Sequence, residues 1–273
     1  MRNHFLRAAA GNVATAPAYV TDNLAFHIDA GNSLSYSSSG SGTSVKNLIH
    51  NDFSSSYNSN INYSASDGGY WSFGITTGYG IEFEIGGNNN YLDIGSNDFT
   101  IEMWMKPTNL GQFNISIPLD YIKEYPQSGF TFNDYLQFYV ILYDVNNQGV
   151  INLRTWYSTQ NNNNANFYGS NFISTTWPNN SSWLHYVVVS DVNSTTREIY
   201  KNGQFLNFLS NSNFNFVRNS NNNQLQIGGA STVSAFPLPF IGDISIVRIY
   251  NGKALSSTEI TQNYNAEKSR YGY

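Results

Sequence analysis

Cysteine is absent from this chain of 273 residues, and charged residues make up only 11% of it. Without cysteine there is no disulfide, no thiolate metal site and no cysteine nucleophile, so stability must come from burial or assembly. The charged fraction is well below the roughly 25% of an average globular protein. The net charge of -5 provides no broad basic field, which argues against a nucleic-acid partner.

Long apolar runs are absent as well. No segment approaches the roughly 18 apolar residues that cross a bilayer, so the sequence predicts no membrane insertion. The opening MRNHFLRAAAG imitates a signal peptide, but Arg7, Gly11 and Asn12 interrupt its apolar stretch. We therefore interpret residues 1–20 as an arm that a partner orders, with export as the alternative, and residues 21–273 as one domain.

Tyrosine and phenylalanine are abundant instead, and asparagine, serine and glycine separate them. Short runs with period-two alternation recur, whereas helical periodicity is nearly missing, which predicts an all-β, antiparallel two-sheet β-sandwich. In residues 99–105 the apolar side chains of Phe99, Ile101, Met103 and Met105 alternate onto one face. The expected strands are residues 24–29, 81–85, 91–94, 99–105, 135–143, 150–157, 183–190, 197–201, 225–227 and 244–250.

Two local signals are more specific. The turn GGNNN between residues 81–85 and 91–94 predicts that these two strands form a hairpin. Near the C-terminus, Ser256 and Glu259 provide a helix start, and Ile260 with Tyr264 supplies an apolar stripe. One short C-terminal helix is therefore expected at about residues 257–267.

The order of these segments resembles the laminin-G-like, concanavalin-A-like jelly roll of lectins and many surface proteins. The likeness covers residues 21–271 and implies fold more than ligand. It rests on LAFHIDAGNSLSY at 24–36, FTIEMWMKP at 99–107, WLHYV at 183–187, IYKNG at 199–203 and GDISIVRIY at 242–250 followed by ALS and EI at 254–260.

The opening HIDAGNSLSY and the closing NYNAEKSRYGY resemble domains of tailed-phage virion proteins in particular. That resemblance implies a head-decoration or tail-associated protein on the virion surface, with a capsid or tail protein as partner of residues 1–20. Association into a homo-oligomer is a further option. An extracellular or cell-surface carbohydrate-binding module is the alternative, and the two hypotheses are compatible.

Glu82 and Glu84 share one face of their expected strand, the spacing that a glycosidase needs for paired carboxylates. Retaining glucanases of the resembled family carry a tighter strand with three acids, and here the strand ends in Gly86 and Gly87. A solvated strand face explains the two glutamates equally. We therefore expect no catalytic residues and predict that the chain is not an enzyme, with a glycoside hydrolase as the third hypothesis.

Aromatic residues beside loops are the candidates for sugar binding, because aromatic faces suit the C–H faces of sugar rings. They are Trp156, Tyr157 and Trp177, whereas Trp104 and Trp183 lie in core-like patterns. Packing explains each of the three candidates as well.

Calcium is the cofactor that the resemblance implies, if the chain holds any, because this fold often stabilises a loop through oxygen ligands. Asp243 aligns with an acid near the family's last strand, where Asp29 and Asn32 of the first strand and its turn would lie beside it. The alternative is that Asp243 caps its own turn after Gly242.

Overall fold

The computed structural model describes the chain in segments. They are residues 18–36, 44–54, 56–57, 60–74, 80–85, 90–92, 97–108, 115–123, 135–145, 148–158, 182–191, 193–194, 196–210, 223–229 and 239–273. Within them, no helix is both long and apolar enough to cross a membrane.

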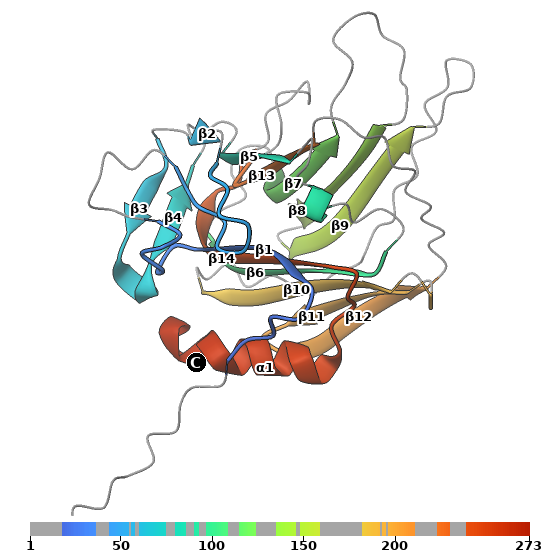
Figure 1. Ribbon diagram of the computed structural model, residues 1–273. Coiled ribbons are helices and arrows are strands. Elements are labelled where there is room, and N and C mark those ends of the chain that lie inside the picture. The colour runs from blue at the N-terminus through green and yellow to red at the C-terminus, as the bar shows by residue number, and fades with distance from the viewer. Residues whose placement is uncertain are drawn as a thin grey trace, which may run out of the picture.

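Two antiparallel sheets form the fold, as predicted (Figure 1). The larger sheet has the order β12-β11-β10-β6-β14-β4-β3, and β1 also pairs with β14. Its strands are β1 (Leu24–Asp29), β3 (Asn62–Ser64), β4 (Tyr70–Phe73), β6 (Phe99–Pro107), β10 (Leu184–Asp191), β11 (Thr196–Lys201), β12 (Gln204–Ser210) and β14 (Gly242–Asn251). The first and last strands are thus neighbours, as the resemblance implied.

The smaller sheet has the order β2-β5-β13-β7-β8-β9. Its strands are β2 (Ser56–Tyr57), β5 (Ile81–Ile85), β7 (Ile115–Lys123), β8 (Tyr135–Val145), β9 (Gln148–Ser158) and β13 (Asn223–Ile227). Strands far apart in the sequence are paired here, since β13 lies between β5 and β7. This long-range pairing sets which side chains share the sheet's outer face.

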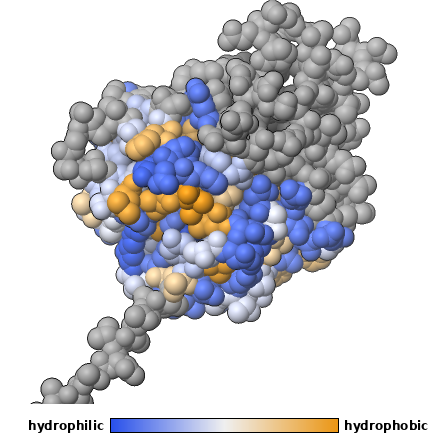
Figure 2. Space-filling view, in the orientation of Figure 1, coloured by the Kyte–Doolittle hydropathy of each residue, from blue (hydrophilic) through white to orange (hydrophobic). Residues whose placement is uncertain are grey.

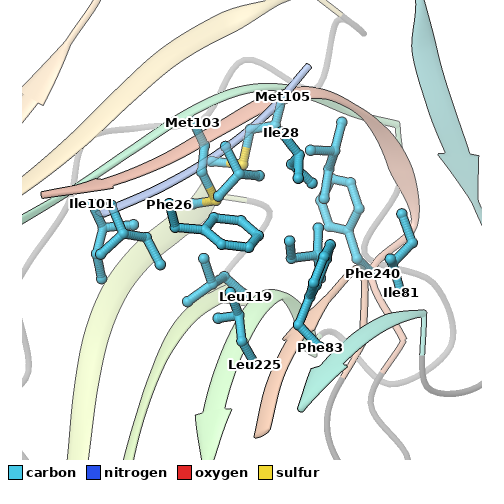
Figure 3. Packing of buried hydrophobic residues seen from close by; sticks show 14 of the residues in the cluster. Phe26, Ile28, Ile81, Phe83, Ile101, Met103, Met105, Leu119, Leu225 and Phe240 are labelled. Carbon is cyan, nitrogen blue, oxygen red and sulfur yellow. The ribbon is translucent and has the colours of Figure 1, made fainter. Parts of the chain in front are cut away.

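The main core lies between the two sheets. Phe99, Ile101, Met103 and Met105 of β6 are all fully buried in it, as their alternation predicts. Figure 3 shows side chains of β1 and β6 facing Phe83, Leu119 and Leu225 of the smaller sheet. Each sheet therefore packs one apolar face against the other sheet, and its second face points away from this core.

Helix α1 (Ser257–Glu267) lies on the outer face of the larger sheet, away from the smaller sheet (Figure 1). The predicted helix start is confirmed: the Ser256 hydroxyl accepts from the Glu259 backbone, and the Glu259 carboxylate accepts from the Ser256 backbone. Ile260 is buried, and the ring of Tyr264 stacks on Trp104 of β6 at 5.8 Å. The helix covers polar as well as apolar side chains of the sheet.

The turn in IYKNG is tight, whereas the predicted hairpin at GGNNN does not form. Asn202 and Gly203, between β11 and β12, both have positive φ, at 51° and 75°, as an Asn-Gly hairpin turn requires. The predicted hairpin of residues 81–85 with 91–94 is wrong. β5 pairs with β2 and β13, and residues 90–92 form a short 3₁₀ turn that buries Leu92.

The segment between β1 and β2 folds back on itself and carries exposed apolar side chains. Lys46 and Phe53 form an isolated β-bridge, and the Lys46 ammonium lies 5.7 Å from the centre of the Phe53 ring. Leu34 and Phe53 are 71% and 60% exposed. Figure 2 shows an apolar band among hydrophilic residues on the visible face of the molecule.

Candidate functional site

The outer face of the smaller sheet, turned away from the core, is the candidate site. On β5, Ile81 and Phe83 are fully buried in the core, and the alternation of a strand places Glu82 and Glu84 on the opposite side. Glu84 is exposed and Glu82 is partly buried. Two carboxylates therefore lie along one strand of this face.

Gln226 on β13 lies opposite Glu82 in the register. Its Nε2 donates a hydrogen bond of 3.1 Å to Glu82 Oε2. Gln226 is only 1% exposed, and its Oε1 has no hydrogen-bond partner in the part of the chain that the structure describes. A buried carbonyl oxygen without a partner costs about 1–3 kcal/mol, so the Gln226 amide is held at this position at an energetic cost.

The register continues across the sheet in two rows, and residues opposite one another lie on the same face. The first row consists of Glu82, Gln226, Asp120, Tyr139 and Arg154. The second consists of Glu84, Gln224, Ile122, Gln137 and Trp156. Among the described side chains of these rows, the two carboxylates of β5 lie beside the amide of Gln226 on β13.

The three predicted sugar-binding residues do not lie together on one described face. Trp156 pairs with Gln137, which gives it a register position in the row of Glu84. Tyr157 follows it on β9 and pairs with Leu136, so it occupies a register position of the opposite face. Trp177 is outside the described residues. Gln226 was not among the candidates, because only the long-range pairing of β13 with β5 sets it beside Glu82.

The predicted calcium ligands are held by the chain's own donors. Asp243 accepts from the Ser72 hydroxyl at 2.6 Å and lies 3.1 Å from the Lys106 ammonium. Asp29 accepts from the Gly31 backbone at 2.8 Å and pairs with Arg270 at 2.8 Å. Since each carboxylate already pairs with a cation, a calcium ion would have to displace both Lys106 and Arg270.

The third predicted ligand, Asn32, accepts from the Leu34 backbone through Oδ1 at 2.9 Å. Within the described residues, no three acidic or histidine side chains gather closely enough to hold a metal ion. The donor set as it stands therefore fits calcium poorly, and calcium at these residues stays a prediction.

Beneath helix α1 lies a buried group of charged side chains, the ion cluster, which consists of Glu102, His185, Arg248 and Glu267. Glu102 Oε1 accepts from Arg248 at 2.9 Å and lies 3.0 Å from His185 Nε2. Arg248 also pairs with Glu267. Glu102, His185 and Arg248 are fully buried, so the cluster is closed to ligands as it stands.

The environment of the ion cluster keeps Glu102 charged. Burial alone would raise the pKa of its carboxyl, but Arg248, His185 and Asn263 together lower the pKa to about 2. Asn263 donates to Glu102 Oε2 at 2.6 Å from α1. Burial raises the pKa of the Glu267 carboxyl against the opposing effect of Arg248. The cluster thereby ties α1 to β6, β10 and β14.

The sequence profile of the concanavalin A-like lectin/glucanases superfamily matches residues 89–261, more than half of the chain. The chain belongs to this superfamily. The matched range includes β6, β10 and β14 of the larger sheet and β7, β8, β9 and β13 of the smaller sheet. A search of curated protein sequences found no match.

Structures similar to this superfamily member include sialidases. Trypanosoma rangeli sialidase in complex with sialic acid has a TM-score of 0.60 and 17% identity, covering 94% of this chain and 35% of the sialidase. The same enzyme as a covalent intermediate with 2,3-difluorosialic acid has a TM-score of 0.60 and 16% identity, covering 98% and 36%. The carbohydrate-binding module CBM40 of Ruminococcus gnavus IT-sialidase has 14% identity and a TM-score of 0.48, covering 70% of this chain and 92% of the module.

These structures correct the prediction that the chain is not an enzyme. A sialidase shares the fold over nearly the whole of this superfamily member, so the fold is compatible with a glycosidase. At 16–17% identity the likeness shows the fold alone. The chain spans about a third of the sialidase, and the activity of that enzyme is not thereby transferred.

Proposed function

We propose that this chain is a carbohydrate-recognition domain that binds a glycan across the outer face of the smaller sheet. The observation that carries the proposal is the pair of Gln226 and Glu82. Glu82 fixes the nearly buried amide through Nε2, and the pair forms a fixed polar floor beside the exposed Glu84. Glu84 and Trp156 in the adjacent row extend the same face.

Two general features support a sugar as the ligand class. The superfamily contains lectins and glucanases. The face also offers a few fixed polar groups together with a register position for an aromatic ring, the composition that carbohydrate sites use. A turnover reaction at the two glutamates is compatible with this proposal, so its test measures binding and hydrolysis together.

The test is a glycan array probed with the full chain, followed by calorimetry on the best-bound glycan. Gln226→Ala should weaken binding by about tenfold or more, because it removes the hydrogen bond that fixes Glu82 on this face. Glu84→Ala should weaken binding without loss of fold, since Glu84 is exposed. Mass spectrometry of the incubated glycan reports any hydrolysis.

The matched control is Gln204→Ala, an exposed glutamine on β12 of the other sheet, which should bind as the native chain does. Thermal unfolding of each variant separates lost binding from lost fold. Native affinity in both Gln226→Ala and Glu84→Ala would reject this face as the binding site.

A second candidate role is presentation of this domain on a phage particle. Ala18 and Val20 are hydrogen-bonded to α1, through Gln262 and Asn263, on the side opposite the smaller sheet (Figure 1). An anchor made by the preceding residues would therefore leave the glycan face pointing outward. Removal of residues 1–17 should abolish incorporation into particles, measured by gradient sedimentation, and unchanged incorporation would reject the role.

A further inference from the structure

The edge strand β12 of the larger sheet exposes two phenylalanine rings side by side. Phe205 and Phe208 are 51% and 57% exposed, and their ring centres lie 6.5 Å apart with an angle of 31° between the rings. Phenylalanine is usually buried, so two exposed rings in contact indicate an interaction site. Figure 1 shows β12 beside α1, on the side of the sandwich away from the smaller sheet.

A β-bulge places both rings on the same face of the sheet. Residues three apart on a regular strand point to opposite faces. Here Phe205 pairs with Tyr200 of β11, and Phe208 pairs with Glu198, because the register shifts between these two pairs. The extra residue, Leu206, packs against the core between the sheets. The bulge thereby turns both phenylalanines to the opposite, outer face.

Tyr200 fixes a carboxylate beside the two rings. It is buried in the cluster that includes Ile260 of α1, so its side chain lies on the outer face as well. Phe205 packs edge-on against the Tyr200 ring at 5.6 Å, and the Tyr200 hydroxyl donates to Glu198 Oε2 at 2.6 Å. Burial and the Glu198 carboxylate raise the pKa of Tyr200, so its hydroxyl stays protonated and donates. One buried tyrosine therefore positions both a ring and an acceptor.

We call Phe205, Phe208 and Glu198 the β12 platform, and its chemistry fits a sugar. The C–H face of a sugar ring stacks on aromatic rings, and a carboxylate beside them accepts from sugar hydroxyls. The platform is small for a protein partner. At half exposure the two rings offer about 200 Å². A stable interface with a second copy of the chain would need about 800 Å² from each partner.

Resting on the proposed carbohydrate function for its ligand class, but not on the smaller sheet, we propose that the β12 platform is a second glycan site. A sugar ring stacks on Phe205 and Phe208, and Glu198 accepts a hydrogen bond from one of its hydroxyls. The two sites lie on opposite sides of the sandwich, so one chain can hold two glycans (Figure 1). Two sites on one molecule raise the apparent affinity for a surface that carries many glycans.

The experiment is calorimetry of the full chain with the oligosaccharides that it binds best on a glycan array. Phe205→Ala/Phe208→Ala should weaken binding at the platform at least about tenfold. Where one glycan binds both sites, the stoichiometry should fall from two to one. Glu198→Ala should weaken binding at the platform about threefold or more, because it removes a charged acceptor.

Phe53→Ala is the matched control, because Phe53 is a phenylalanine of another segment that is 60% exposed. Gln204→Ala serves as a second control, since the alternation of β12 turns Gln204 away from Phe205. Both controls should bind as the native chain does. Thermal unfolding of each variant separates lost binding from lost fold.

Native affinity and stoichiometry in Phe205→Ala/Phe208→Ala would overturn the inference and leave the site of the smaller sheet to be tested by its own variants. Unchanged glycan binding together with lost self-association, measured by analytical ultracentrifugation, would assign the platform to a second copy of the chain instead. Binding of no glycan by the native chain would overturn the carbohydrate function and this inference together.

Discussion

Single charged residues in otherwise apolar strands indicate buried ion pairs whose partners the sequence alone does not identify. Glu102 in FTIEMWMKP and Arg248 in GDISIVRIY each interrupt a strand whose other residues are mostly apolar. Such a residue is a signal for a buried partner, because an unpaired buried charge is strongly unfavourable. The sequence cannot name that partner, since β6 and β14 are about 140 residues apart in the chain and meet only in the sheet.

His27 makes the free energy of unfolding depend on pH. It lies opposite Arg248 in the register and makes an edge contact with the ring of Tyr19. Among the described residues, neither of its ring nitrogens has a hydrogen-bond partner. Burial, and secondarily the charges of Arg248 and Arg270, lower the pKa of His27 well below its usual value, against the opposing effect of Glu102. The folded protein therefore holds this imidazole neutral.

Because the folded pKa lies below the unfolded one, the unfolded chain binds an extra proton below about pH 6.5. The contribution of His27 to stability is full above that pH and is lost as the pH falls. Between pH 7 and 5 the slope should approach 1.4 kcal/mol per pH unit at most, measured by urea unfolding. His27→Phe, which keeps an aromatic ring against Tyr19, should reduce this slope, and an unchanged slope would refute the argument.

At the scale of elements, the signals of the helix were reliable, whereas a turn signal did not reveal which strands pair. Helix α1 was predicted at its observed bounds because the capping box of Ser256 and Glu259 and the apolar stripe lie within one short segment. The hairpin of residues 81–85 was wrong because β5 takes β13 as its partner, which is more than 130 residues away. Strands β2, β3, β4, β7 and β12 were not predicted, and of these β2, β4 and β7 each pair with a strand that does not adjoin them in the chain, namely β5, β14 and β13.

The capping box also allows a quantitative test of α1. Ser256→Ala removes the hydroxyl that accepts from the Glu259 backbone, and it should lower the free energy of unfolding by about 1 kcal/mol. The matched control is Ser257→Ala, one residue further at an exposed helix position. Chemical denaturation compares the two variants, and equal losses in both would show that the cap does not hold the helix.

At the scale of the whole molecule, the two outer faces of the sandwich have different uses. Helix α1, the ion cluster and the segment from Ala18 to Val20 lie on the outer face of the larger sheet. The smaller sheet keeps Glu82, Glu84 and Gln226 on its outer face. The sequence predicted the sandwich and the position of Glu82 and Glu84 on one face of their strand. It could not predict that Gln226 lies beside them, because that follows from the order of strands in the sheet.

This division makes the boundary of the folded domain testable. The Tyr250 hydroxyl donates to the Val20 carbonyl at 3.0 Å, the Val20 backbone donates to Asn263 at 2.8 Å, and the Arg248 guanidinium lies 4.0 Å from the centre of the Tyr19 ring. Removal of residues 1–17 keeps these contacts and should leave the free energy of unfolding unchanged. Removal of residues 1–20 uncovers the ion cluster and should lower it by about 2–4 kcal/mol.

Tyr19→Ala in the shorter truncation isolates the ring over Arg248 and should account for about 1–2 kcal/mol of that loss. Urea unfolding of the three proteins measures the differences. If removal of residues 1–17 were as destabilising as removal of residues 1–20, the folded unit would extend before Ala18. In that case, a protein without residues 1–17 could fail to enter particles because it is less stable. If it is as stable as the native chain and still fails to enter particles, the failure is due to a missing anchor.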